Sequence, residues 1–147
     1  MRIEAYDTAH LQGEDMVGVM VVVDAGEARK DQYRKFKIRS VDRSNDTGAL
    51  KEMLERRLGH PEWPFPQLIG GDGSTAQKNA AELILKKLGF VIPVLAVVKD
   101  ERHKPIRVLG AKKLRDQYED QALLANAEAH RFSLLSHRSM RRKRAVT

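Results

Sequence analysis

The stretch MVGVMVVVD, Met16–Asp24, decides the fold class of this chain. It is apolar at nearly every position and rich in β-branched valine, which predicts a strand that is covered on both faces. A strand is also predicted over Ile3–Thr8, before the turn-like residues QGED, and the hairpin-type turn DAGE follows the valine run. Beyond it, Phe36 and Ile38 alternate with basic residues, as expected of a third strand. These segments predict an antiparallel meander.

The rest of the chain alternates between helical and strand patterns. Helices are predicted over 44–60, over 74–89 and from about Glu119 into the basic C-terminal residues, and strands over 67–73 and 91–100. Residues 101–110 read as a polar loop or a short hairpin. The order β-β-β-α-β-α-β-α predicts an α/β fold with a mixed five-stranded sheet, in which an antiparallel meander joins parallel strands and helices cover the faces.

Polar residues and glycines mark the ends of the first two helices. Asn45 or Asp46 can cap the first helix, and Gly59 can end it. Ser74 and Gln77 have the spacing of a capping box at the start of the second helix.

Composition limits the classes of protein to which the chain can belong. Its 147 residues suit one domain, and no apolar run is long enough to span a bilayer. The chain has no cysteine and no apolar signal-peptide core at its start, which favours a cytoplasmic location. The net charge is +7 and the pI about 9.8. This excess fits a polyanionic partner such as nucleic acid, and it fits a solvated basic surface equally well.

Two aspartates are placed where chemistry could occur. Asp7 lies near the end of the first predicted strand, and Asp72 follows QLIG just before a tight turn into a helix. If these two strands are parallel neighbours, both carboxylates emerge at one edge of the sheet. Two carboxylates together form a hard oxygen site suited to Mg²⁺ or Mn²⁺. Each aspartate taken alone reads better as an ordinary strand-end or turn residue.

A histidine occupies the last predicted helix, in the stretch NAEAHRFSLLSHR. His130 shares a helical face with Leu123, Ala127 and Leu134, and this face is expected to point inward. A histidine in that position either meets a buried partner or serves a site, and the pattern by itself favours a core histidine with a satisfied partner.

Several stretches together resemble the nuclease domain in the C-terminal half of the UvrC family. The resemblance is carried by IEAYDTAHLQGEDMVGVMVVV, QYRKFKIRSVDRSNDTGALKEMLERR, PQLIGGDGSTAQKNAA, IPVLAVVKDE and ANAEAHRFSLLSHRSMRRKR. These stretches cover nearly the whole chain in the family's order. The resemblance implies an RNase H-like fold, which agrees with the order of strands and helices.

The same resemblance implies a function and a site. Its catalytic set falls on Asp7, Asp72 and His130, with Mg²⁺ or Mn²⁺ held by the two aspartates and with His10 as support. His130 could act as a general base, shuttle a proton or contact the metal, and these alternatives stay open. The implied reaction is hydrolysis of a phosphodiester on the 5′ side of a lesion during nucleotide excision repair. The implied partners are damaged double-stranded DNA and, for the parent protein, a UvrB-type protein; the domain itself is expected to be monomeric.

The sequence departs from the family's pattern in two places. Gly70 and Gly71 stand where apolar residues are usual, which predicts a short or irregular strand. Ser74 and Thr75 stand where Gly-Lys is usual, so that lysine's contact is either absent here or comes from elsewhere, with Lys78 and Lys99 as possible replacements.

The C-terminal end is strongly basic. We predict an RNase H-like endonuclease domain over 1–137 and a basic tail over 138–147, with DNA contacts from Arg131, Arg138, Arg141, Arg142, Lys143 and Arg144. Basic residues also suit the C-terminus of any solvated helix.

Two rival functions share this fold. One is a non-catalytic DNA-binding or scaffold domain, against which the presence of both aspartates and the histidine argues. The other is a different nuclease, such as a ribonuclease H or a junction resolvase, against which the EAHRF helix argues.

Overall fold

The computed structural model describes residues 1–10, 16–39, 45–102 and 104–146, and for His10 and residues 137–146 it describes only the backbone. The predicted QGED turn lies outside these residues. The strands are β1 Arg2–His10, β2 Met16–Asp24, β3 Glu27–Ala28, β4 Arg34–Lys37, β5 Leu68–Asp72, β6 Val94–Lys99 and β7 Pro105–Leu109. The helices are α1 Asp46–Leu58, α2 Thr75–Lys87 and α3 Lys112–Val146, with a short 3₁₀ helix, η1, over Lys30–Gln32.

The strands form one mixed sheet in the order β3-β2-β1-β5-β6-β7, and β4 also pairs with β2. Strand β2 runs antiparallel to β1 and β4, whereas β1, β5 and β6 run parallel to one another. The predicted meander and parallel strands are therefore confirmed, but the predicted five strands become seven within the described residues. The additional strands are the two-residue β3 and the largely exposed β7, which falls within residues 101–110, predicted from the sequence to be a polar loop or a short hairpin.

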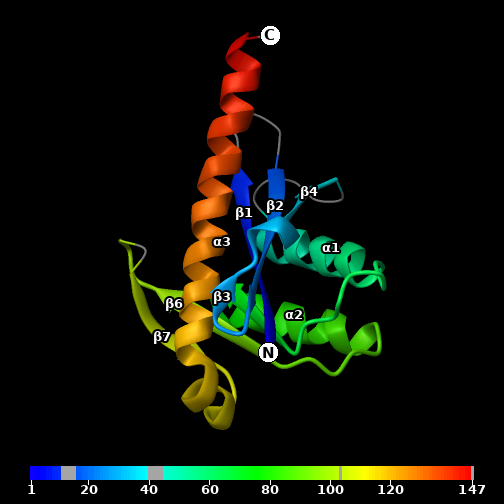
Figure 1. The fold of residues 1–147 in the computed structure, drawn as a ribbon, viewed down its shortest axis with the longest axis vertical. Helices are drawn as coiled ribbons and strands as arrows, with labels where there is room; N and C mark the ends of the chain where they lie inside the picture. The colour runs from blue at the N-terminus through cyan, green and yellow to red at the C-terminus, as the bar shows by residue number, and fades with distance from the viewer. Residues whose placement is uncertain (11–15, 40–44, 103, 147) are drawn as a thin grey trace.

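Helices cover both faces of the sheet, with α3 on one face and α1 and α2 on the other (Figure 1). Strand β2 is buried along both faces, as the valine run predicted. Its Met20 and Val22 pack in the core beneath α1 and α2, while Val21 and Val23 pack in the core beneath α3. The two apolar cores thus lie on opposite sides of the central strands.

Helix α3 packs through small residues, and this differs from the prediction. It begins at Lys112 rather than near Glu119. Its buried face is made of small and short polar residues: Ala122, Ala125, Asn126, Ala129, Ser133 and Ser136. Ala127 and Leu134 are exposed, so the predicted inward face was wrong. Small side chains allow the helix to approach the sheet closely, which larger leucines would prevent.

The ends of the helices follow the predicted signals in part. The side chain of Asn45 accepts a hydrogen bond of 2.9 Å from the backbone N–H of Gly48, which caps α1 as predicted. Gly89, after α2, adopts a φ of +83°, a conformation that favours glycine. Ser74 is the N-cap of α2, but its side chain makes no capping hydrogen bond, so the predicted capping box is not formed.

A buried ion pair joins α1 to the central strand β1. The guanidinium of Arg57 donates to both carboxylate oxygens of Glu4, at 2.7 and 2.8 Å, and both side chains are fully buried. Arg2 donates to the same carboxylate at 3.0 Å, and so does the hydroxyl of Tyr6 at 2.8 Å. Burial, followed by the charge of Glu4, raises the pKa of Tyr6 well above its ordinary value, so this phenol stays protonated and remains a donor.

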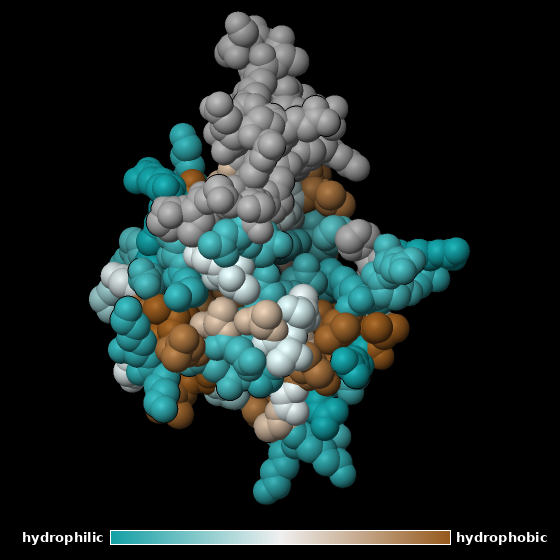
Figure 2. Space-filling model, turned by 180° about the vertical axis from the view of Figure 1, so that it is seen from behind, coloured by the Kyte–Doolittle hydropathy of each residue, from teal (hydrophilic) through white to brown (hydrophobic). Residues whose placement is uncertain are grey.

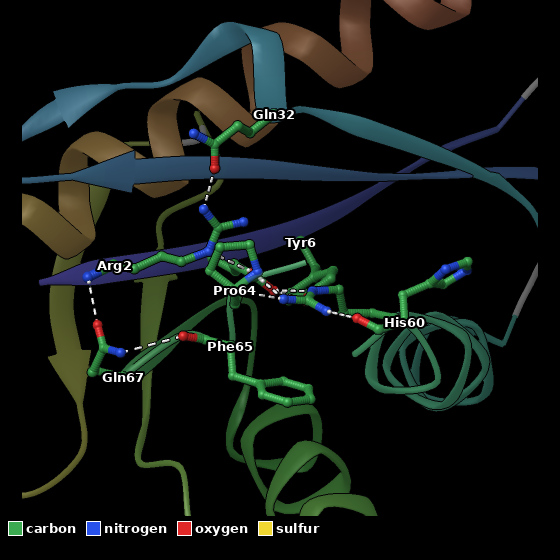
Figure 3. Close-up of polar contacts among 9 residues, drawn as sticks. Arg2, Tyr6, Gln32, His60, Pro64, Phe65 and Gln67 are labelled. Atoms are coloured by element: carbon green, nitrogen blue, oxygen red, sulfur yellow. Dashed lines mark hydrogen bonds and ion pairs between the residues drawn. The ribbon is translucent and has the colours of Figure 1, made fainter. Parts of the chain in front are cut away.

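Arg57 also fixes the proline-rich connection between α1 and β5. It donates to the carbonyl oxygens of His60 and Pro64, at 3.3 and 2.6 Å, and its guanidinium lies 5.4 Å from the centre of the Trp63 ring. The close-up in Figure 3 shows the hydrogen bonds to His60 and Pro64, at the end of the helix beside the sheet. Together they satisfy the buried charges and hold helix, connection and strand in one arrangement.

The face of the molecule seen in Figure 2 is mainly hydrophilic where it is coloured, with apolar side chains in separate patches. No helix in the described part of the chain is both long and apolar enough to cross a membrane.

Replacing Arg57 with Ala should lower the free energy of unfolding by about 3–5 kcal/mol, because Glu4 would be left buried without its main partner. Urea unfolding would measure this change as a lower midpoint with an unchanged slope. The control is Arg29→Ala, which breaks a 3.3 Å pair with Glu27 on the surface and should cost under about 1 kcal/mol. Equal losses in both variants would contradict the structural importance of the buried pair.

Candidate active site

Asp72 is the last residue of β5, and Asp7 lies in the neighbouring parallel strand β1, three residues before that strand ends at His10. The β1–β5 register pairs Ile3 with Leu68 and Ala5 with Gly70, and two further residues place Asp7 level with Asp72. Both aspartates line one pocket of about 50 Å³. The condition set by the sequence, that these two strands be parallel neighbours, is therefore met.

The pocket contains a third acid, for which the sequence pattern predicted only a role as a helix cap. Asp46, the first residue of α1, lines the pocket together with Asp7 and Asp72. An acid at this position also suits the positive end of the helix dipole. The only signal in the sequence was an acidic residue at a helix start, and that signal does not indicate which strands the helix end approaches.

His130 reaches Asp7 from α3. Its Nδ1 lies 3.5 Å from Oδ2 of Asp7, and its side chain is 39% exposed. The hydroxyl of Ser133, one turn further along α3, donates to the carbonyl oxygen of Thr8 at 3.0 Å, which holds the helix against the end of β1. The backbone N–H of Thr8 donates to Oδ1 of Asp7 at 2.7 Å. His130 is thus a partly exposed residue beside an acid, and the reading as a buried core histidine does not hold.

Lys99 lies at the other aspartate. Its Nζ is 3.2 Å from Oδ1 of Asp72, and its side chain is only 11% exposed. Lys78, the other lysine considered from the sequence, instead pairs with Glu82 within α2. The glycines before Asp72 do not make the strand irregular, since β5 pairs with β6 through Gly70, Gly71 and Asp72.

The charges at this end of the sheet compensate one another only in part. Burial, followed by the charge of Asp72, raises the pKa of Asp7, while the Thr8 N–H, Lys99 and His130 act in the opposite direction. Among the described residues, no three His, Asp or Glu side chains are close enough to form a complete set of metal ligands. The two aspartates nevertheless present the oxygen ligands and the uncompensated negative charge that a hard divalent cation requires.

The other predicted site residues are placed only partly. The side chains of His10, Arg138, Arg141, Arg142, Lys143 and Arg144 lie outside the described residues, although α3 continues through residue 146. Arg131 is described, and its Nε donates to Glu128 at 2.7 Å. This bond to Arg131 is the main cause that lowers the pKa of Glu128 to about 2. Contact of these basic residues with DNA stays a prediction, as does the division of the chain at residue 138.

The sequence profile of the UvrC RNase H endonuclease domain matches residues 1–141 of the chain. The chain belongs to the UvrC RNase H endonuclease domain family. The resemblance stated from the sequence motifs is thus confirmed.

Related proteins named UvrABC system protein C agree with this family membership. The protein from Caldicellulosiruptor saccharolyticus is 39% identical over 97% of the chain, and that from Clostridium perfringens is 35% identical over 99%. The protein from Prosthecochloris aestuarii is 36% identical, also over 99%. The chain spans about a quarter of the length of these relatives, namely 25%, 27% and 24%.

The UvrC-family fold also resembles that of a solved nuclease. Endonuclease V from Ciona intestinalis, in complex with DNA that contains an inosine, matches with a TM-score of 0.52 over 85% of the chain and 56% of that protein. The sequences are 14% identical, so this match concerns the fold alone. The predicted RNase H-like fold class is confirmed, apart from the number of strands.

Replacing Asp7 with Asn should raise the free energy of unfolding at pH 7 in the presence of a chelator. The folded-state pKa of Asp7 lies above its ordinary value, so the unfolded state loses this proton first as the pH rises. The stability that goes with the protonated carboxyl is present below the ordinary pKa of about 3.9 and is lost as the pH rises through the folded-state pKa. Urea unfolding at pH 7 and pH 3 should show a gain at pH 7 and none at pH 3, whereas a gain of the same size at both would contradict this origin.

Proposed function

We propose that the chain is a metal-dependent endonuclease domain that hydrolyses a phosphodiester of DNA. The observation that carries this proposal is the meeting of Asp7 and Asp72 in one pocket, with the imidazole of His130 at 3.5 Å from Asp7. Membership of the UvrC RNase H endonuclease domain family supports it.

Asp7 and Asp72 would hold a divalent cation, Mg²⁺ or Mn²⁺, and Asp46 is a third acid in the same pocket. Bound there, the cation would neutralise negative charge on the phosphate as the transition state forms. The partial burial of Asp7 strengthens its attraction for a cation, because the surrounding side chains screen less than water does.

His130 would take the proton from the attacking water. Its contact with Asp7 orients the ring, and an imidazole can accept a proton near neutral pH. The contact from Ser133 to the backbone of Thr8 keeps the helix that carries His130 in register with the strand that carries Asp7. The site thus joins two elements that are distant in the chain.

The substrate that we propose is damaged double-stranded DNA, cut on the 5′ side of the lesion in nucleotide excision repair. Support comes from the relatives named UvrABC system protein C and from the net charge of +7. In the parent protein the domain would act together with a UvrB-type partner. Arg131, Arg138, Arg141, Arg142, Lys143 and Arg144 would bind phosphates without reading bases.

The chain should nick lesion-bearing duplex DNA with Mn²⁺ or Mg²⁺ and not with a chelator. Asp7→Asn and Asp72→Asn should abolish nicking because each removes an anionic oxygen ligand. His130→Gln should reduce the rate by about 10²–10⁴-fold, the usual contribution of a general acid or base. Gel separation of nicked from intact strands would measure the rates.

The control for His130 is His60→Gln. His60 lies at the proline-rich connection and stacks on Trp63, away from the pocket, so its variant should nick at the normal rate. Normal nicking by the His130 variant, or equal losses in both histidine variants, would remove His130 from the proposed mechanism. Normal nicking by both aspartate variants would refute the proposed site.

Removing residues 139–147 should weaken binding to duplex DNA. The slope of log affinity against log salt concentration should become shallower by about 0.9 for every phosphate that the tail no longer neutralises. Fluorescence anisotropy at several salt concentrations would measure this slope for the full and shortened chains. An unchanged slope would show that the tail does not bind phosphates.

A further inference from the structure

Lys99 is a mostly buried cation beside the two carboxylates of the proposed metal site. Its Nζ lies 3.2 Å from Oδ1 of Asp72, and only 11% of its side chain is exposed. Its charge also acts on Asp7, since it opposes the rise in the pKa of that residue. One lysine therefore offsets negative charge on both aspartates.

The pairing of the strands places Lys99 beside the two aspartates. Strand β6 pairs with β5 in parallel, with Val97 opposite Asp72, so Lys99 emerges at the same end of the sheet. The pairing of β6 with β7 shifts between Val98 and Lys99, where Ile106 of β7 is passed over. Such bulges redirect side chains beside functional sites. The position of Lys99 thus depends on the sheet rather than on a loose surface contact.

We propose that Lys99 is a built-in counter-ion of Asp7 and Asp72, which a divalent cation must displace from Asp72 in order to bind. This inference rests on the proposed function, because it concerns the same carboxylates. The ammonium and the cation compete for the same negative charge and repel each other at short range. Lys99 would therefore lower the affinity of the site for the cation and stabilise the carboxylate pair when no cation is bound.

The test measures the binding of Mn²⁺ itself, without DNA. Free Mn²⁺ gives an electron paramagnetic resonance signal that disappears on binding, so a titration yields the affinity of each variant. Lys99→Met, or Lys99→Gln if the first variant does not fold, should bind Mn²⁺ about tenfold more tightly than the wild type, which equals about 1.4 kcal/mol. Lys99→Arg keeps the charge and should bind at nearly the wild-type affinity.

The matched control is Lys86→Met, which removes the same charge from an exposed position in the last turn of α2, about 16 Å along the helix from its first residue, Thr75. At about 0.15 M salt, exposed charges further apart than about 8 Å are largely screened, so this variant should bind Mn²⁺ within about twofold of the wild type. Equal tightening in the Lys99 and Lys86 variants would overturn the proposal, because a general charge effect would then explain both.

Unfolding measurements provide a second readout. In a chelator, Lys99→Met should unfold at a lower urea concentration than the wild type, because the two carboxylates lose their compensating charge. Added Mn²⁺ should then raise its midpoint more than it raises that of the wild type. If the wild type binds Mn²⁺ and Lys99→Met binds it no more tightly, this inference alone is overturned. If neither binds, the metal-dependent function fails and the inference fails with it.

Discussion

The ion pair between Glu4 and Arg57 is the interaction on which the arrangement of the site depends. Glu4 and Asp7 lie on the same strand, and Arg57 belongs to the helix whose first residue is Asp46. Because the pair is fully buried and its oxygens are all engaged, the helix has little freedom to slide along the strand. The distance between the acids at the far end is therefore governed by a contact in the interior of the fold. A buried pair of this kind favours one packing arrangement of helix and strand over others, even where it adds little to the free energy of unfolding.

On the opposite face of the sheet, the small size of the side chains, rather than an ion pair, determines how the helix packs. Alanines and serines of α3 face the sheet, and across from them Ala5 and Gly70 occupy neighbouring strands. A Cβ atom added at Gly70 would meet the Cβ of Ala5 at 3.4 Å, which is already van der Waals contact between the two strands. The helix can therefore lie close to the strands, and His130, at the edge of the packed face, reaches Asp7.

The sequence supported the main architecture because the valine run, the strand-helix alternation and the glycine stops are local signals with clear physical causes. It also placed Asp72 at a strand end and Asp7 near one, although β1 continues to His10 and the meeting of the two aspartates depended on strand order. The predicted orientation of α3 was wrong because its leucines were expected on the buried face, whereas alanines and short polar residues occupy that face in the closely packed structure. Neither the approach of Asp46 to the pocket nor that of Lys99 to Asp72 was derivable, since each depends on how distant elements pack.

The length of helix α3 has a consequence for the candidate site. Its 35 residues span about 52 Å at a rise of 1.5 Å per residue, and Figure 1 shows its C-terminal end projecting beyond the sheet. The part that carries His130 is held against β1 by the hydrogen bond from Ser133 to Thr8, so a displacement of the projecting turns would reach the candidate site through one continuous helix.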